Sequence, residues 1–285
     1  MIIEYIKACI YGIIEGISEW LPISSTGHLI LFERILSFDL PFNNASTKEQ
    51  FLSMFDVVIQ FGAILAVVFT HFKEINPFQK QRKHEIWQLW GKLCLATIPA
   101  AIIGFALDTV CNVYFGKDLE VLIFTPQTVA CALITYGILF ILVEMLSKYP
   151  QKASCDSVSF KQAFAIGCFQ ALAIIPGTSR SGATVLGARI LGISRDSATK
   201  FSFLAAIPII SSAGLLKVFE FAKYAFQNEA GIPADALMIL LVAGTCAFAI
   251  SMLTIKFLTD FVKKHTFIPF GIYRIILGTV VLFAL

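Results

Sequence analysis

The chain contains six stretches of mostly apolar residues, each about 20 residues long and therefore sufficient to cross a bilayer as one helix. They run approximately over Phe51–Phe72, Leu89–Leu107, Val121–Leu146, Phe201–Phe221, Ala236–Leu258 and Phe267–Leu285. Only 14% of the 285 residues are charged, whereas roughly 25% is usual in a soluble domain. The pattern predicts an all-α polytopic membrane protein with six transmembrane helices.

The remaining composition argues against several other classes of protein. The net charge of +3 is not gathered into a basic patch with interleaved aromatic residues, so we expect no nucleic-acid partner. The N-terminus lacks a basic n-region, and Glu15 and Glu19 would interrupt an apolar h-region, so we expect no cleaved signal peptide. The seven cysteines show no paired spacing and are expected to be small core residues rather than disulfides or metal ligands. They are Cys9, Cys94, Cys111, Cys131, Cys155, Cys168 and Cys246.

Two further apolar segments are interrupted by clusters of proline, serine and glycine. The first runs from Ile2 to Leu21, breaks at Pro22 and resumes over His28–Phe38. The second has the same shape, with Phe160–Ile175 and Gly182–Ile193 on either side of its break. Irregular backbone at membrane depth is tolerated only where protein buries it or where it lines a wet cavity. We therefore predict two re-entrant helical hairpins.

The two hairpins are related in sequence. A shift of 155 positions places Gly12–Leu36 on Gly167–Leu191 without a gap and gives seven identities, which include two glycines and an arginine. Three apolar stretches follow each hairpin. The chain is therefore predicted to be a single membrane domain of two repeats, at approximately 1–146 and 158–285.

Basic residues predict the orientation of these repeats. They concentrate between the first two spans and before the second hairpin and the last span, at Lys73, Lys80, Arg82, Lys83, Lys92, Lys148, Lys152, Lys161, Lys263 and Lys264. The connections Phe38–Gln50, Val110–Glu120 and Lys223–Asp235 are poor in such residues and should face outward. Because each half has three spans, the second half should be inverted relative to the first, with the broken helices meeting near the midplane.

The first break carries two carboxylates, Glu15 and Glu19, whose i, i+4 spacing places them on one helix face. Their mutual repulsion can be relieved by Mg²⁺ or Ca²⁺, by an arginine or by protonation of one group. The alternative is that both simply face water at the mouth of the hairpin. We expect a functional role, because ionisable residues inside membranes are usually functional.

The hydroxyl side chains of Ser24, Ser25 and Thr26 follow, together with Gly27 and His28. At least one of the three hydroxyls should cap the next helix and do nothing more. A lone histidine is a weak signal, but beside hydroxyls and carboxylates it is a candidate general acid or base.

The second break centres on Arg180, between Ser179 and Ser181, with Gly182 and Thr184 leading into a helix. A guanidinium offers two parallel donors to phosphate oxygens, and a helix N-terminus adds free N–H groups. The sequence thus predicts a phosphate cradle. The alternative is an arginine that pairs with a hairpin carboxylate, and both are compatible if Arg180 binds Glu19 only when the site is empty.

Other polar residues in the apolar segments receive weaker assignments. Gln60, and less strongly Asp56, are candidates to line the same cavity. The repeat-related Arg34 and Arg189 are expected to anchor the hairpins to headgroups or backbone carbonyls. Four charged residues near span ends are expected to snorkel towards the interface, namely Glu144, Lys217, Glu220 and Arg274.

Several segments of the sequence resemble those of a known family. The segments EGISEWLPISSTGH, from Glu15 to His28, and PGTSRSGAT, from Pro176 to Thr184, are similar to the two signature motifs of the bacterial undecaprenyl-diphosphatase (bacitracin-resistance) family. The resemblance extends to FDVVIQ, ending at Gln60, and to FIPFGIYR, ending at Arg274. It implies paired re-entrant helices, commonly in a homodimer of the bacterial inner membrane, with the site open to the outer face. The active-site residues that it implies are Glu15, Glu19, Ser25, His28, Ser179, Arg180 and Thr184.

The resemblance implies hydrolysis of undecaprenyl diphosphate to undecaprenyl phosphate and inorganic phosphate, which recycles the lipid carrier of cell-wall synthesis, with dependence on Mg²⁺ or Ca²⁺. We expect Glu15 and Glu19 to hold the cation. The phosphate-binding residues should be Ser24, Thr26, Gly27, Ser179, Arg180, Ser181, Gly182, Thr184 and Gln60. Ser25, deprotonated by His28, is the favoured nucleophile, and a water activated by Glu19 or His28 is the alternative. A lipid-phosphate flippase, alone or combined with the phosphatase, is the rival function, because inverted repeats with broken helices are also a transporter architecture.

Overall fold

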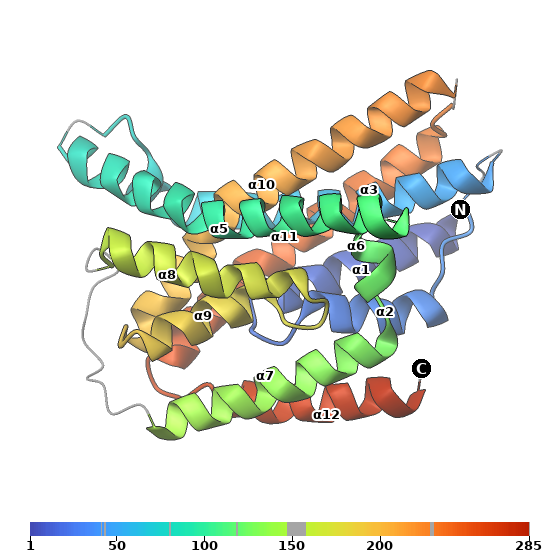
Figure 1. Ribbon diagram of the computed structural model, residues 1–285. Helices are drawn as coiled ribbons and strands as arrows, with labels where there is room; N and C mark the ends of the chain where they lie inside the picture. Colours follow the sequence, from blue (N-terminus) through green and yellow to red (C-terminus); the bar gives the residue numbers. More distant parts are fainter. Residues whose placement is uncertain are drawn as a thin grey trace.

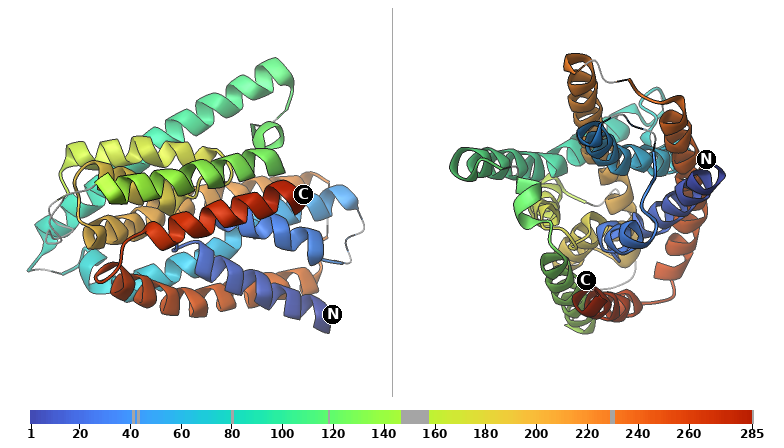
Figure 2. Two further views of the ribbon diagram at one scale, coloured as in Figure 1. Left: turned by 90° about the horizontal axis from the view of Figure 1, so that it is seen from below. Right: turned by 90° about the vertical axis from the view of Figure 1, so that its right-hand side faces the viewer.

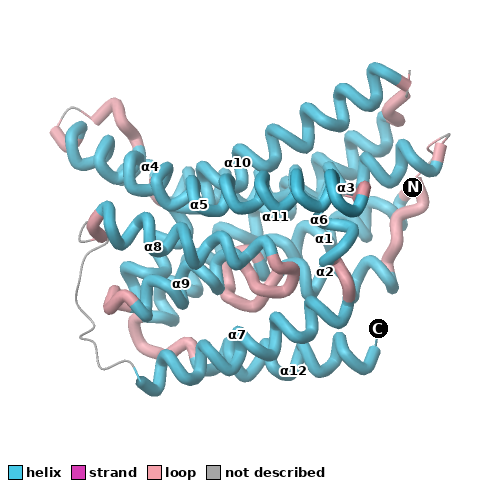
Figure 3. Tube along the Cα trace, viewed as in Figure 1, coloured by secondary structure: helices cyan, strands magenta, loops and turns pink. Residues whose placement is uncertain are grey.

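The protein is a bundle of α-helices (Figure 1), and Figure 3 shows that loops and turns link helices throughout the described chain. The computed structural model describes residues 1–40, 42, 44–79, 81–117, 119–146, 158–228 and 231–284. In this part of the chain the helices are α1 (Ile2–Ser18), α2 (Ser25–Ile35), α3 (Ala45–Thr70), α4 (Phe72–Ile75), α5 (Lys83–Phe115), α6 (Leu119–Ile123), α7 (Pro126–Leu146), α8 (Phe160–Ala171), α9 (Arg180–Ile190), α10 (Arg195–Gln227), α11 (Ala234–Val262) and α12 (Ile268–Ala284). A short 3₁₀ turn, Leu172–Ile174, extends α8.

Five of these helices are long and apolar enough to cross a membrane, which agrees with a polytopic membrane protein. They are α3, α5, α7, α10 and α11, and they contain the first five predicted apolar stretches almost entirely. The sixth stretch forms α12, which has 17 residues in the described part of the chain and is therefore a shorter apolar helix. At 1.5 Å per residue, such a helix spans only about 25 Å.

Two pairs of short helices turn back on themselves where the sequence predicted breaks. The chain reverses between α1 and α2, and again between α8 and α9, with the two turns in the interior of the bundle (Figures 1 and 2). Pro22 and Pro176 lie in these turns, because proline cannot supply the N–H that a continuing helix needs.

The helices pack most extensively as α7 with α12, α1 with α11, α3 with α11, α5 with α8, and α3 with α10. Small residues allow close approach. A Cβ on Gly137 of α7 would lie 2.7 Å from the carbonyl oxygen of Gly271 on α12, and the reverse contact is the same length. Gly12 of α1 packs against the backbone of Ala243 on α11, and Gly167 of α8 against that of Ala96 on α5. The first helix of each hairpin, α1 or α8, thus packs on a long helix, α11 or α5, through a glycine that lies against backbone.

Both chain termini lie at one end of the bundle, and the basic connection through α4 lies at the other (Figures 1 and 3). That opposite end carries Lys73, Arg82 and Lys83, as well as Lys263 and Lys264 after α11. Lys80, Lys148 and Lys152, which entered the predicted orientation, lie outside the described residues, as does Cys155.

The expectation that Arg274 and Glu144 snorkel towards the interface is wrong. Arg274 is fully buried, and Glu144 is 7% exposed, so neither snorkels towards an interface. Glu144 instead accepts from Arg189 Nε at 3.0 Å and Arg195 Nε at 2.7 Å, while Arg189 Nη1 also donates to the Ile193 carbonyl. Arg189 therefore joins a buried ion-pair cluster rather than a headgroup, although its expected carbonyl contact is present. The side chain of its repeat partner, Arg34, is not among those described.

The cysteines also differ from the expectation of a shared core role. Among the described residues Cys111 is buried, whereas Cys94, Cys131 and Cys168 are exposed on helix surfaces. All six described cysteines are free thiols. In a bilayer a helix face exposed to lipid is as apolar as a core, so hydropathy alone does not separate the two environments.

Candidate active site

The two turns end in the same way, with a serine that caps the following helix. Ser24 accepts a hydrogen bond on Oγ from the N–H of Gly27 at 3.3 Å, and Ser179 accepts one from Gly182 at 3.1 Å. Both serines have positive φ, 75° and 70° respectively, and they are the two described non-glycine residues that do so. The expectation that one hydroxyl of the first break serves as a cap is confirmed for Ser24.

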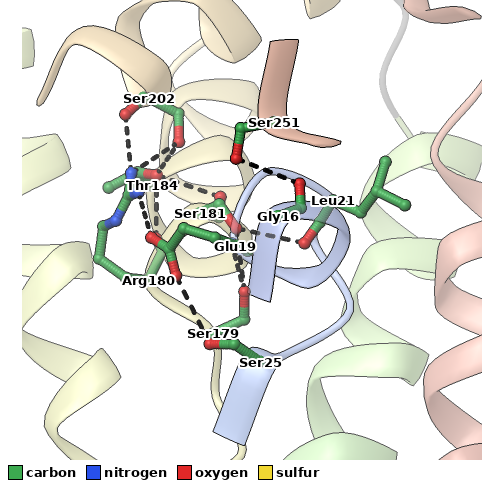
Figure 4. A network of polar contacts seen from close by, with 11 residues as sticks. Gly16, Glu19, Leu21, Ser25, Ser179, Arg180, Ser181, Thr184, Ser202 and Ser251 are labelled. Atoms are coloured by element: carbon green, nitrogen blue, oxygen red, sulfur yellow. Dashed lines mark hydrogen bonds and ion pairs between the residues drawn. The ribbon is translucent and has the colours of Figure 1, made fainter. Parts of the chain in front are cut away.

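An ion pair joins the two breaks. The Nη2 of Arg180 lies 2.7 Å from Oε1 of Glu19, and both side chains are largely buried, with 12% and 7% of their surfaces exposed (Figure 4). The guanidinium also lies over the ring of Trp20, with Cζ 5.8 Å from the ring centroid. The structure therefore brings together the carboxylate of one predicted site segment and the cation of the other.

Hydroxyl groups surround the arginine on its α10 side (Figure 4). Arg180 Nη1 donates to the Ser202 carbonyl at 2.7 Å, and Ser202 Oγ is 2.7 Å from Thr184 Oγ1. Ser181 Oγ is 3.1 Å from Ser179 Oγ and donates to the carbonyl of Leu21 at 3.4 Å. Ser202 was not predicted, since it is one of four serines in α10 and nothing in the sequence distinguishes it from the others.

Ser25 and His28 do not form the predicted nucleophile–base pair. Ser25 Oγ donates instead to Glu19 Oε2, at 3.5 Å. The two ring nitrogens of His28 are occupied by the Ser24 carbonyl, 2.7 Å from Nδ1, and by the Tyr273 hydroxyl, 2.6 Å from Nε2. Because a carbonyl oxygen only accepts, Nδ1 carries a proton, and Nε2 is engaged by the Tyr273 hydroxyl. The nearest base to Ser25 in these contacts is therefore Glu19.

Glu15 is the least satisfied polar group of the site. Its side chain is fully buried, and neither carboxylate oxygen has a hydrogen-bond partner among the described residues. An uncompensated buried carboxylate is costly, so this position calls for a proton or a cation. Within the described chain no third histidine, cysteine or carboxylate completes a cluster with Glu15 and Glu19. Two carboxylates nevertheless fit Mg²⁺, which commonly takes one or two from the protein and the rest of its shell from phosphates and water.

Three other predicted residues have weaker ties to this network. Gln60, on α3, is half-buried, and no described hydrogen bond joins it to the site. Thr26 lies in the first turn of α2, and its side chain makes no described hydrogen bond. Gly27 packs against Leu133, whose Cδ1 would lie 3.1 Å from a Cβ on Gly27. Gln170, at the repeat position of Glu15, donates to the Ala96 carbonyl at 3.1 Å and belongs to helix packing.

Arg274 is the main residue that sequence reasoning missed. From α12 it donates to the carbonyls of Pro22, Gly177 and Thr178 at 3.1, 2.9 and 2.9 Å, and so touches both breaks. Its position within an apolar segment could have predicted its burial, because an arginine in such a segment is expected to face the protein interior. The distance of 97 positions from Gly177 hid its partners.

Comparison with known proteins identifies the family. The sequence model described as "Bacitracin resistance protein BacA" matches residues 8–280. The chain belongs to the BacA family. The expected resemblance is thus confirmed over nearly the whole chain.

Three similar proteins share one name. A protein from Streptococcus mutans named "Undecaprenyl-diphosphatase" is 49% identical over 286 residues, covering 98% of this chain and 95% of the relative. Proteins of the same name from Streptococcus suis and Enterococcus faecalis are 45% and 44% identical, covering 99% and 97% of this chain and 97% and 95% of each relative.

Proposed function

We propose that this protein is an integral-membrane phosphatase that hydrolyses undecaprenyl diphosphate to undecaprenyl phosphate and inorganic phosphate. BacA-family membership and relatives of nearly the same length named undecaprenyl-diphosphatase support this activity. The single structural observation that supports it best is the ion pair between Glu19 and Arg180, which places a base and a phosphate-binding cation at one point in an apolar bundle.

We also propose that the bundle contains six spans and two re-entrant hairpins in an inverted repeat, within the bacterial inner membrane. The packing of α1 on α11 corresponds to that of α8 on α5 when the halves are exchanged, and α3–α10 and α7–α12 exchange onto themselves. The matching conformations of Ser24 and Ser179 support the same relation. The basic end, with Lys73 and Lys263, would be cytoplasmic, and the site would open to the outer face.

Substrate binding would use the second break. The N-terminus of α9 offers free N–H donors and a positive dipole end to a phosphate, and the guanidinium of Arg180 offers a bidentate donor. To receive phosphate oxygens, Arg180 would release Glu19, so that ligand binding and exposure of the carboxylate are coupled. The Ser202 carbonyl, at 2.7 Å, keeps the other arm of the guanidinium in place.

A buried carboxylate pair also suits a divalent cation, which when bound would neutralise charge on the phosphoryl oxygens. Glu15 would hold it together with Glu19, because the Glu15 oxygens have no described partner and a cation would compensate them. Preorganised positive charge of this kind accounts for most of the rate enhancement in phosphoryl transfer.

Two nucleophiles are consistent with these contacts. In the first route Ser25 Oγ attacks the terminal phosphorus, Glu19 accepts its proton, undecaprenyl phosphate leaves, and water then hydrolyses the phosphoserine. In the second route Glu19 takes the proton from a water, which attacks phosphorus directly. The 3.5 Å contact between Ser25 Oγ and Glu19 Oε2 favours the first route. Trapping phosphate on Ser25 would establish it, whereas near-normal turnover by Ser25→Ala would establish the second.

The activity is tested with purified protein in detergent and undecaprenyl diphosphate. We expect phosphate release by the wild type and its loss in Glu19→Ala and Arg180→Ala. Lys217→Ala, which alters an exposed pair with Glu220 on α10, is a matched control and should keep full release. Binding of the lipid without phosphate release would contradict the phosphatase and favour the lipid-phosphate flippase.

A further inference from the structure

One buried cation, Arg274, contacts both breaks of the chain. Its Nη1 donates to Pro22 in the first break, and its Nη2 donates to Gly177 and Thr178 in the second. Nη1 also lies 3.1 Å from the Cβ that Gly182 would carry, so the first turn of α9 packs directly on the guanidinium. The side chain is fully buried, with Cζ 5.6 Å from the ring centroid of Tyr136.

The hydrogen-bond partners of this buried cation are uncharged. Within the described residues, backbone carbonyls rather than a carboxylate accept from the two Nη groups, and the buried Nε has no hydrogen-bond partner. Burial of a charge without a counter-ion is unfavourable, so its presence requires a compensating role. Only a planar group with several donors can reach carbonyls on two separate segments, and lysine has a single nitrogen.

We propose that Arg274 is a positioning residue that holds the two breaks in register, so that Glu19 and Arg180 face each other across the site. More than half of the chain separates the two breaks in sequence. The other direct bonds between them are the Glu19–Arg180 ion pair, which would open when Arg180 binds phosphate, and the 3.4 Å bond from Ser181 Oγ to the Leu21 carbonyl. Arg274 binds only main chain, so its contacts can persist when Arg180 turns from Glu19 to phosphate. The effect on turnover rests on the proposed phosphatase activity, but the positioning itself does not.

The bond to Thr178 has a further effect on the phosphate cradle. In a planar trans peptide the C=O and N–H groups point in opposite directions, so the N–H of Ser179 points away from the guanidinium. A carbonyl that accepts from a cation polarises its peptide unit and strengthens the N–H of the same unit as a donor. Arg274 therefore both places the Ser179 peptide and improves it as a ligand for anionic oxygen.

Hydrogen–deuterium exchange of the detergent-solubilised protein tests the positioning without reference to activity. In Arg274→Gln we expect amides in both 19–26 and 175–182 to exchange about tenfold faster, with a smaller increase in Arg274→Lys. Arg189→Gln is the matched control, because Arg189 is also buried but bonds to Glu144 and Ile193. It should accelerate exchange around those partners and leave the first break unchanged.

Phosphate release by the same variants provides the second measurement. We expect kcat to fall about 100-fold in Arg274→Gln with little change in KM, the effect of a misplaced reacting group, while Arg189→Gln stays near wild type per folded molecule. If Arg274→Gln does not fold, Arg274→Lys carries both measurements. The proposal is wrong if one break or neither responds in exchange, or if Arg189→Gln loosens both breaks equally. A wild type that releases no phosphate, with exchange changed as expected, would contradict the proposed function and leave the positioning role intact.

Discussion

Ser24 and Ser179 lie 155 positions apart in the sequence, and each starts a helix from nearly the same left-handed backbone conformation. Their φ and ψ angles are 75° and 104° for Ser24, and 70° and 120° for Ser179. Side-chain-bearing residues rarely adopt positive φ, and such conformations cost of order 1–3 kcal/mol. The matched strain sits at the two points where the proposed phosphate site is built.

Glycine at either serine should therefore stabilise the protein and reduce its activity. Ser179→Gly removes the strain and loses only a few tenths of a kcal/mol of capping, whereas Ser179→Ala keeps the strain and loses about 1 kcal/mol. We expect the thermal midpoint in detergent to rise for the glycine variant and fall for alanine, by about 2–4 °C per kcal/mol. A lower midpoint for both variants would mean that the serine conformation is not strained. Phosphate release should fall in both because the hydroxyl is lost.

The ion pair between Glu19 and Arg180 predicts the response to conservative changes. Arg180→Lys keeps the charge but cannot bind a phosphate and the Ser202 carbonyl with a planar fork, so we expect kcat to fall by about 10²–10³. Glu19→Gln keeps the shape of the side chain but removes the base, so we expect its kcat to fall at least as far. Steady-state phosphate release measures both effects. Turnover by Arg180→Lys within a few-fold of wild type would show that a point charge suffices.

Glu15 distinguishes a bound cation from a protonated carboxylate. If a divalent cation compensates Glu15, chelation should abolish phosphate release, Mg²⁺ or Ca²⁺ should restore it, and Glu15→Gln should raise the half-saturating cation concentration about tenfold or more. If a proton compensates it, Glu15→Gln should retain the wild-type cation dependence. Cation titrations of the wild type and of Glu15→Gln separate these outcomes.

The buried cluster around Glu144 should contribute strongly to stability. Glu144→Gln leaves Arg189 and Arg195 without their carboxylate in the interior, and breaking a buried pair in this way costs about 3–5 kcal/mol. Asp260→Asn removes the carboxylate of an exposed pair with Lys263 and should leave the thermal midpoint unchanged. Equal midpoints for the two variants would contradict a structural role of the Glu144 cluster.

Local sequence signals predicted the parts of this fold that depend on neighbouring residues. Apolar length located the five helices that are long and apolar enough to cross a membrane, and the prolines with serine and glycine located both turns to within a few residues. The inverted repeat of broken helices predicted that the two turns meet near the midplane. The contact between Glu19 and Arg180 agrees with it.

Features that depend on how distant helices pack could not be read in this way. Ser25 and His28 are three positions apart and suggested a pair, but Tyr273 approaches His28 from α12 and occupies its Nε2. The sequence suggested that Arg274 lies near a span end, because hydropathy does not show how deeply a charged residue within an apolar segment is buried. Its burial follows from the packing of α12 beside α7 and against both turns.

The position of Arg274 on α12 bears on how the protein is made. Synthesis proceeds from the N-terminus, so α1, α2, α8 and α9 leave the ribosome well before the helix that carries this arginine. During that interval the nascent chain already contains both carboxylates and Arg180, yet it lacks the three hydrogen bonds that tie the turns together. If Arg274 aligns the two turns as proposed, the half-made protein carries Glu15, Glu19 and Arg180 without their final alignment, and the site forms only when α12 joins the bundle.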